Sequence, residues 1–114
     1  MALVYPAPEA RDHMADWYVY IVSNKAHTLY TGITNDLPKR IQQHKDRTYD
    51  NAFTARYTFN RLVYYEPAPD QKTAAIRERR IKNWPRAKRV ALIESMNPNW
   101  EDLSVRFDLG HLLR

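Results

Sequence analysis

The sequence predicts an α+β fold, in which a small three-stranded antiparallel sheet is flanked by helices in the order β-β-α-β-α-α. Short β-rich runs over residues 17–22, 28–33 and 59–66 are separated by turn signals, and amphipathic stretches follow the second and third runs. The chain has 114 residues, enough for one domain with one core.

The first two runs are expected to form a hairpin, because the short polar stretch 23–27 lies between them. With this stretch as the loop, Tyr20 lies opposite Tyr30. A register change of two residues would keep both phenols on one face, because side chains alternate with period two. A change of one residue would separate them.

The next element is a helix that begins with Asn35 or Asp36 as its cap and runs to about Asp46. Arg40 and His44 lie four residues apart in it and therefore share one stripe of its surface. Taken alone, such a pair is typical of a solvated face. Its functional interpretation is phosphate stabilisation by arginine and proton transfer by histidine.

Residues 47–57 predict a loop, and Phe59 to Glu66 a third strand that Pro67 and Pro69 end. Asp70 is expected to cap a helix to about Asn83.

The dipeptide Trp84-Pro85 then predicts a break, because a residue before proline disfavours α geometry. A last helix should run to about Met96. Asn97, before a proline, is interpreted as a helix stop rather than a ligand. Trp84 and Trp100 are interpreted as docking residues rather than base-stacking platforms.

We expect a disordered or tag-like tail over residues 1–16, a compact domain over 17–103 and a C-terminal tail over 104–114. His13-Met14 matches the dipeptide that a common cloning site leaves. Residues 1–13 are therefore either a cloning remnant or a natural extension.

The formal net charge of +5 and the pI near 9.6 favour a polyanionic partner, nucleic acid before an anionic membrane surface. The chain has no cysteine, which excludes disulfides, thiolate metal sites and cysteine nucleophiles. No apolar run approaches the roughly 20 residues of a membrane span. We expect a cytoplasmic protein without a membrane partner.

Glu78 is the most informative single residue of the later helix. On a helical wheel, Ala74, Ala75 and Ile81 define the apolar arc, and Glu78 falls inside it. An inward carboxylate needs a partner, a metal or a raised pKa. The alternative is a structural ion pair with a nearby arginine.

A basic cluster surrounds Glu78 and, with Arg56 of the loop, predicts contact with a phosphate backbone. The alternative is an ordinary charged helix surface. The cluster comprises Arg77, Arg79, Arg80, Lys82, Arg86, Lys88 and Arg89.

The series Tyr20, Tyr30, Arg40, His44 and Glu78 resembles the GIY-YIG nucleases. Their two signature triplets correspond to residues 18–20 and 30–32, and the similarity is strongest to the small stand-alone bacterial members. Shared runs cover residues 53–57, 62–66, 81–84 and 97–103. Departures from the signature are Tyr18, Val19 and Thr31, and Ile33 stands where some relatives have a basic residue.

The resemblance implies cleavage of DNA phosphodiesters with one divalent ion, Mg²⁺ or Mn²⁺, held by Glu78. It implies that Tyr20 activates water and Tyr30 assists or orients it. It further implies that Arg40 stabilises the phosphate, and that His44 relays a proton or positions the nucleophile. The late asparagine of the family corresponds to Asn97.

The function predicted is therefore a nonspecific or structure-selective DNA endonuclease in repair, recombination or DNA processing. Two alternatives stay open. One is a noncatalytic nucleic-acid-binding module that retains the fold, and the other is an interaction subunit whose protein partner supplies targeting.

Overall fold

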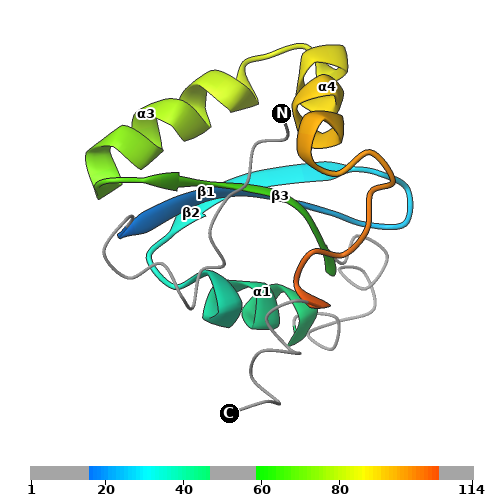
Figure 1. The fold of residues 1–114 in the computed structure, drawn as a ribbon, viewed down its shortest axis with the longest axis horizontal. Helices are drawn as coiled ribbons and strands as arrows, with labels where there is room; N and C mark the ends of the chain where they lie inside the picture. Colours follow the sequence, from blue (N-terminus) through cyan, green and yellow to red (C-terminus); the bar gives the residue numbers. More distant parts are fainter. Residues whose placement is uncertain (1–15, 47–58, 106–114) are drawn as a thin grey trace.

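The computed structural model describes residues 16–46 and 59–105, and it confirms the predicted α+β fold (Figure 1). β1 (Trp17–Ser23), β2 (Leu29–Thr34) and β3 (Arg61–Ala68) form one antiparallel sheet in the order β2-β1-β3. The first strand is therefore central, and the other two are edges.

Helices cover both faces of this sheet. α1 (Leu37–Asp46) lies on one face, and α3 (Gln71–Lys82) and α4 (Arg86–Met96) lie on the other (Figure 1). The order of elements is the predicted one. The predicted tails before residue 16 and after residue 105, and the predicted loop with Arg56, lie outside the described residues.

β1 and β2 pair in a register two residues away from the predicted one. Tyr20 pairs with Gly32, and Val22 pairs with Tyr30. The two phenols are therefore diagonal neighbours instead of lying directly opposite. They stay on one face of the sheet, as predicted, because the change is an even number of residues.

The register changes because the first strand continues through Ser23, and the turn uses residues 24–28 instead. Asn24 closes this turn. Its Oδ1 accepts hydrogen bonds from the backbone N–H groups of Ala26 and Thr28, each at 3.0 Å. A side chain that satisfies two turn donors in this way fixes where the hairpin reverses.

α1 begins and ends where the sequence predicts. Asp36 caps it, with Oδ1 accepting from the backbone N–H of Lys39 at 3.2 Å. Leu37 and Ile41 are buried against the sheet. The core on this face contains Tyr18, Tyr20, Val22, Leu37, Ile41, Leu62, Tyr65 and Leu103.

β3 continues two residues beyond the predicted end at Glu66. Pro67 lies within the strand and pairs with Tyr18. The expectation that this proline ends the strand is wrong, because an edge strand has one side that needs no ladder partner.

The two later helices also follow the prediction. Asp70 caps α3, with Oδ1 accepting from the backbone N–H of Thr73 at 2.7 Å, and Asn83 is its C-cap. Pro85 stands immediately before α4. Within the described parts of the chain, no helix has the length and apolar character needed to cross a membrane.

α3 and α4 bury a second core on their face of the sheet. Ala74 and Ile81 enter it from α3, and Ile93 enters it from α4. The remaining buried members are Val19, Ile21, Val63, Tyr64, Ala68 and Trp100. The alternation along β1 therefore separates two packed layers, one on each face.

The segment after α4 connects these two layers. Trp100 is buried in the core on the α4 side, whereas Leu103 is buried in the core on the α1 side. The backbone N–H of Leu103 donates to the carbonyl of Leu62 at 2.8 Å. The chain thus passes across β3 at this point.

Candidate active site

Tyr20 and His44 form a buried polar pair between β1 and α1. The Tyr20 hydroxyl lies 2.9 Å from Nε2 of His44, and the two rings meet edge to face with centroids 5.6 Å apart. Tyr20 is 2 % exposed and His44 is 7 % exposed. Burial strengthens such a hydrogen bond electrostatically and holds both groups in one geometry.

Tyr30 completes this arrangement at the solvent boundary, because 43 % of its surface is exposed. Its ring centroid lies 6.4 Å from that of Tyr20 and 5.2 Å from that of His44. Phe59 packs beside it, with centroids 5.8 Å apart. The structure therefore brings together two phenols and an imidazole from three different elements.

Gly32 makes room for this cluster. A Cβ atom at this position would lie 2.6 Å from the Tyr20 hydroxyl and 2.7 Å from the carbon that bears it. The phenol therefore lies across the backbone of β2, where only glycine leaves space. The sequence interpretation placed Gly32 in the second signature triplet but did not assign it this steric role.

Arg40 lies one helical turn before His44 on α1. It is half-buried and lines a polar hollow together with Thr34 and Lys39. Arg40 and His44 therefore lie on one stripe of α1, one turn apart.

Glu78 comes from the other layer. α3 packs on the face of the sheet opposite to α1, so the carboxylate and the cluster of Tyr20, Tyr30 and His44 start from different faces. The Glu78 side chain is only 22 % exposed, as its place in the apolar arc predicts. Its Oε2 lies 3.2 Å from Nζ of Lys82, so its partner is a lysine and not the arginine considered above.

A metal ion would find one carboxylate here. Within residues 16–46 and 59–105, no three side chains of His, Cys, Asp or Glu gather as a ligand set. Glu78 offers a hard oxygen donor, which fits magnesium, since this ion commonly keeps several waters and takes few protein ligands.

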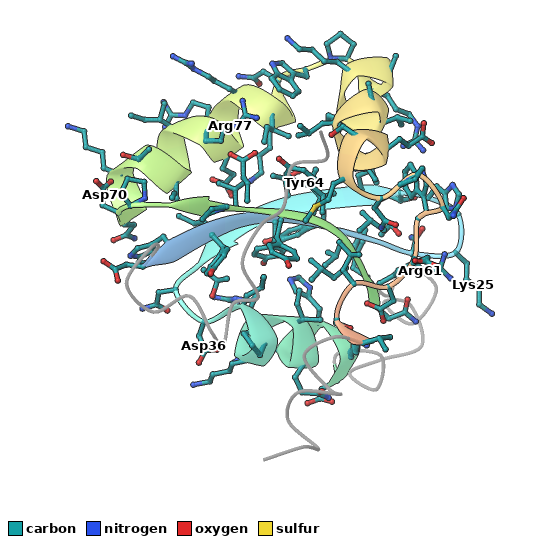
Figure 2. The ribbon with its side chains drawn as sticks, in the orientation of Figure 1. Lys25, Asp36, Arg61, Tyr64, Asp70 and Arg77 are labelled. Carbon is teal, nitrogen blue, oxygen red and sulfur yellow. The ribbon has the colours of Figure 1, made fainter. Side chains whose placement is uncertain are left out.

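Some members of the basic cluster form contacts within the protein, and others are exposed to solvent. Arg77 forms a forked contact with Glu66, at 2.8 Å from Nε and 3.1 Å from Nη2. This hydrogen bond raises the pKa of the Arg77 guanidinium, although burial opposes the rise. Glu66 also accepts from the Tyr64 hydroxyl at 2.6 Å, so Arg77 belongs to an internal network (Figure 2).

The other cluster members present their charges differently. Arg79, Arg80 and Arg86 are exposed on α3 and α4. Lys82 is paired with Glu78, and Arg89 is half-buried.

Trp84 joins α3 to α4 and holds two of the cations. Lys88 Nζ lies 4.2 Å from its ring centroid, and Arg77 Cζ lies 5.2 Å from it. Trp84 is half-buried and packs against the core, as the docking interpretation predicts. Trp100 docks too, and its Nε1 donates to Glu94 at 2.8 Å.

Asn97 is buried and uses its amide entirely on the backbone. Nδ2 donates to the carbonyls of Val63 at 3.1 Å and Glu101 at 2.8 Å, and Oδ1 accepts from the N–H of Glu101 at 3.0 Å. These contacts support the helix-stop interpretation over a ligand role.

Asp102 is a structural residue that sequence reasoning missed. It accepts from Lys45 Nζ at 2.9 Å, from Leu62 N at 3.1 Å, and from Ser104 N and Oγ at 3.0 and 2.7 Å. Burial alone would raise the pKa of its carboxyl, but the hydrogen bonds from Ser104 and Lys45 outweigh burial and hold it below its ordinary value. No sequence pattern links residues 57 positions apart.

Known proteins resemble this chain over most of its length. A model of the GIY-YIG catalytic domain matches residues 16–91. A UPF0213 protein of Clostridium perfringens is 38 % identical over 96 residues, which cover 81 % of this chain and 98 % of that protein. A UPF0213 protein of Desulfotalea psychrophila is 39 % identical over 83 residues, covering 69 % of this chain and 72 % of that protein.

UPF0213 protein YhbQ of Escherichia coli is 30 % identical over 80 residues, covering 70 % of this chain and 79 % of that protein. No solved structure matches the chain significantly. The names of these relatives state no activity. The family match extends from β1 into α4, and so includes both tyrosines, the arginine–histidine helix and the glutamate: the chain belongs to the GIY-YIG nuclease family.

Proposed function

We propose that this protein is a divalent-metal-dependent endonuclease that hydrolyses phosphodiester bonds in DNA. Nonspecific or structure-selective cutting fits best, because no helix or ribbon within the described residues offers an evident base-reading surface. The observation that carries the proposal is the convergence of Tyr20, Tyr30 and His44. Repair, recombination or general DNA processing would use such an activity.

The buried pair suits proton transfer. With Nε2 of His44 unprotonated, the Tyr20 hydroxyl donates to it and becomes a better acceptor for a proton from water. Tyr30 is the accessible phenol, and in this proposal it orients the water or the phosphate.

Arg40 supplies positive charge beside this cluster. A guanidinium favours the charge that builds on a phosphoryl group during transfer. Its place one turn before His44 allows both side chains to face the same phosphate.

Glu78 is the residue that would hold the metal ion. When bound, magnesium or manganese supplies charge neutralisation of the phosphate. Because Glu78 belongs to the α3 layer, a substrate that contacts both it and the phenols has to reach around the sheet, and β2 is the edge strand on which α3 mainly packs. To bind the metal ion, Glu78 must also give up its ion pair with Lys82.

The decisive experiment compares wild type with Glu78→Gln on labelled DNA in magnesium. The panel contains single strand, duplex, flap, fork and junction substrates. We expect wild type to cut at least one substrate, and Glu78→Gln to lose cutting while its thermal unfolding stays within a few degrees. Lys72→Gln, an exposed change on the same helix, serves as the matched control. Equal cutting by the Glu78 variant would contradict the proposal.

A second candidate function rests on the pairing of Glu78. Its contact with Lys82, and the position of α3 and α1 on opposite faces of the sheet, favour a noncatalytic nucleic-acid-binding module. That function predicts salt-sensitive DNA binding without turnover in magnesium or manganese. Turnover that depends on Glu78 excludes it.

A further inference from the structure

A polar hollow lies beside Arg40, where β2 leads into α1. Its volume is about 210 Å³, whereas a water molecule takes roughly 30 Å³ of liquid volume. It therefore has room for a hydrated anionic group. Its lining is entirely polar or charged: Thr34, Asn35, Asp36, Lys39, Arg40 and Gln43.

The acid in this lining is already engaged in local structure. Asp36 caps α1 through the N–H of Lys39, and its own N–H donates to Thr34 Oγ1 at 3.0 Å. The two cations are available. Within the described parts of the chain, neither Lys39 nor Arg40 forms an ion pair. With one acid and two cations, the lining carries a net positive charge.

The position of the hollow relates it to the candidate active site. Arg40 lines the hollow, and His44 follows it by four residues, which is about 6 Å along a helix. His44 in turn contacts Tyr20 and Tyr30. Successive nucleotides of one strand rise about 3.4 Å along a duplex axis. A strand that runs along α1 with one phosphate at His44 would therefore bring the phosphate about two nucleotides away to the hollow.

We propose that this hollow is a second phosphate subsite, in which Lys39 binds a phosphate that flanks the one at the cluster of Tyr20, Tyr30 and His44. Asn35 and Gln43 provide amide donors for the same anion. This inference rests on the proposed function and extends it, because it assigns Lys39 to substrate positioning. The bound group is an internal phosphodiester or a terminal phosphate of the strand.

The first test measures binding without cleavage. Oligonucleotide affinity is followed by fluorescence anisotropy against salt in a Glu78→Gln background, with and without Lys39→Gln. Losing one phosphate contact should reduce the slope of log K against log salt by about 0.7 to 0.9. Lys25→Gln is the control, since Lys25 is exposed in the turn between β1 and β2, at the far end of the sheet from Asp36 (Figure 2).

The second test locates the phosphate and identifies its source. Single methylphosphonate linkages, which carry no charge, are placed one at a time along the oligonucleotide. A methylphosphonate at one flanking position should weaken binding by the protein that has Lys39. At that same position, the Lys39→Gln variant should bind with the same affinity as the protein that has Lys39. If removal of a 5′-phosphate does this instead, the subsite takes a terminal phosphate.

The third readout is kinetic. In the active enzyme, Lys39→Gln should raise KM several-fold and change kcat less than twofold, whereas Lys25→Gln should change neither. The inference is overturned if Lys39→Gln and Lys25→Gln give the same salt slope and no methylphosphonate position distinguishes them. If wild type cuts no DNA, the proposed function fails, but the binding tests still decide the subsite.

Discussion

The hydroxyl of Tyr20 lies 2.6 Å from the point where Gly32 would carry a Cβ atom. Tyr20 pairs directly with Gly32 across β1 and β2, and the same hydroxyl is bound to His44. The absence of a side chain at Gly32 therefore sets the height of the phenol above the sheet and, through it, the geometry of the hydrogen bond.

Gly32→Ala tests this relationship. The added methyl must displace the Tyr20 ring, and overpacking of this kind typically costs about 1–3 kcal/mol. We expect a folded protein with a lower unfolding temperature and a kcat reduced by at least tenfold. Thermal unfolding by circular dichroism and nicking rates measure the two effects. Thr31→Ala, on the opposite face of the same strand, is the control. If Gly32→Ala had the same kcat as wild type, the steric role of Gly32 would be contradicted.

A double-mutant cycle tests the buried pair. Tyr20→Phe removes the hydroxyl, and His44→Gln removes the imidazole. If the two act as one proton-transfer unit, each single change should lower kcat by about 10²–10⁴-fold. The double variant should then be no slower than the slower single variant. Multiplicative losses would show that the two groups act independently.

Asp102→Asn tests the tie between β3, α1 and the segment after α4. The pKa of this carboxyl lies below its ordinary value of 3.8, so its charged form stabilises the fold. That stabilisation is present above pH 3.8 and is lost as the pH falls below it. We expect the variant to lose about 2 kcal/mol at pH 7, the size typical of hydrogen bonds to charged groups.

Urea unfolding at pH 7 and pH 3 measures this difference. The gap between wild type and the Asp102 variant should shrink at pH 3. Asp46→Asn is the control, because Asp46 is exposed and, among the residues that the structure describes, its side chain is bonded to Gln42 alone. If the difference in the free energy of unfolding were equal at both pH values, the stabilisation would come from the packing of the Asp102 side chain and not from its charge.

Substitutions at Arg77 and Arg79 test which members of the basic cluster stabilise the fold and which contact DNA. Arg79→Gln should leave stability unchanged and reduce the salt slope of DNA binding by about 0.7–0.9, because Arg79 is exposed. Arg77→Gln should lower stability instead, since Arg77 is held by Glu66. Thermal unfolding and anisotropy titrations on both variants check this division. The reverse pattern would place the DNA over Glu66.

The sequence predicted the order of elements because its local signals agree with the tertiary fold. Asp36 and Asp70 are caps whose side chains perform the predicted bonds. The hairpin register was off by two because the pattern does not show that Asn24 closes the turn. Side-chain alternation is insensitive to an even change, so Tyr20 and Tyr30 still share a face.

The candidate site was harder to predict because it depends on how layers stack. A helical wheel places Glu78 inward, and the structure agrees, but a wheel does not state which face of the sheet its helix covers. Likewise the burial of His44 against Tyr20 comes from packing of α1 on the sheet. Lys39 could not be singled out because no sequence pattern shows that side chains of residues 34–43 enclose a hollow.

The segment from Asn97 to Leu103 has a consequence for proteolysis. It anchors on Val63 and Leu62 of β3, and it fills a core on each side of the sheet. A single peptide-bond cleavage just after Met96 would leave Trp100 and Leu103 held to the two layers by noncovalent contacts alone, and would so weaken both layers at once. Resistance of this stretch to a protease is thus a one-band gel readout of the integrity of the whole domain.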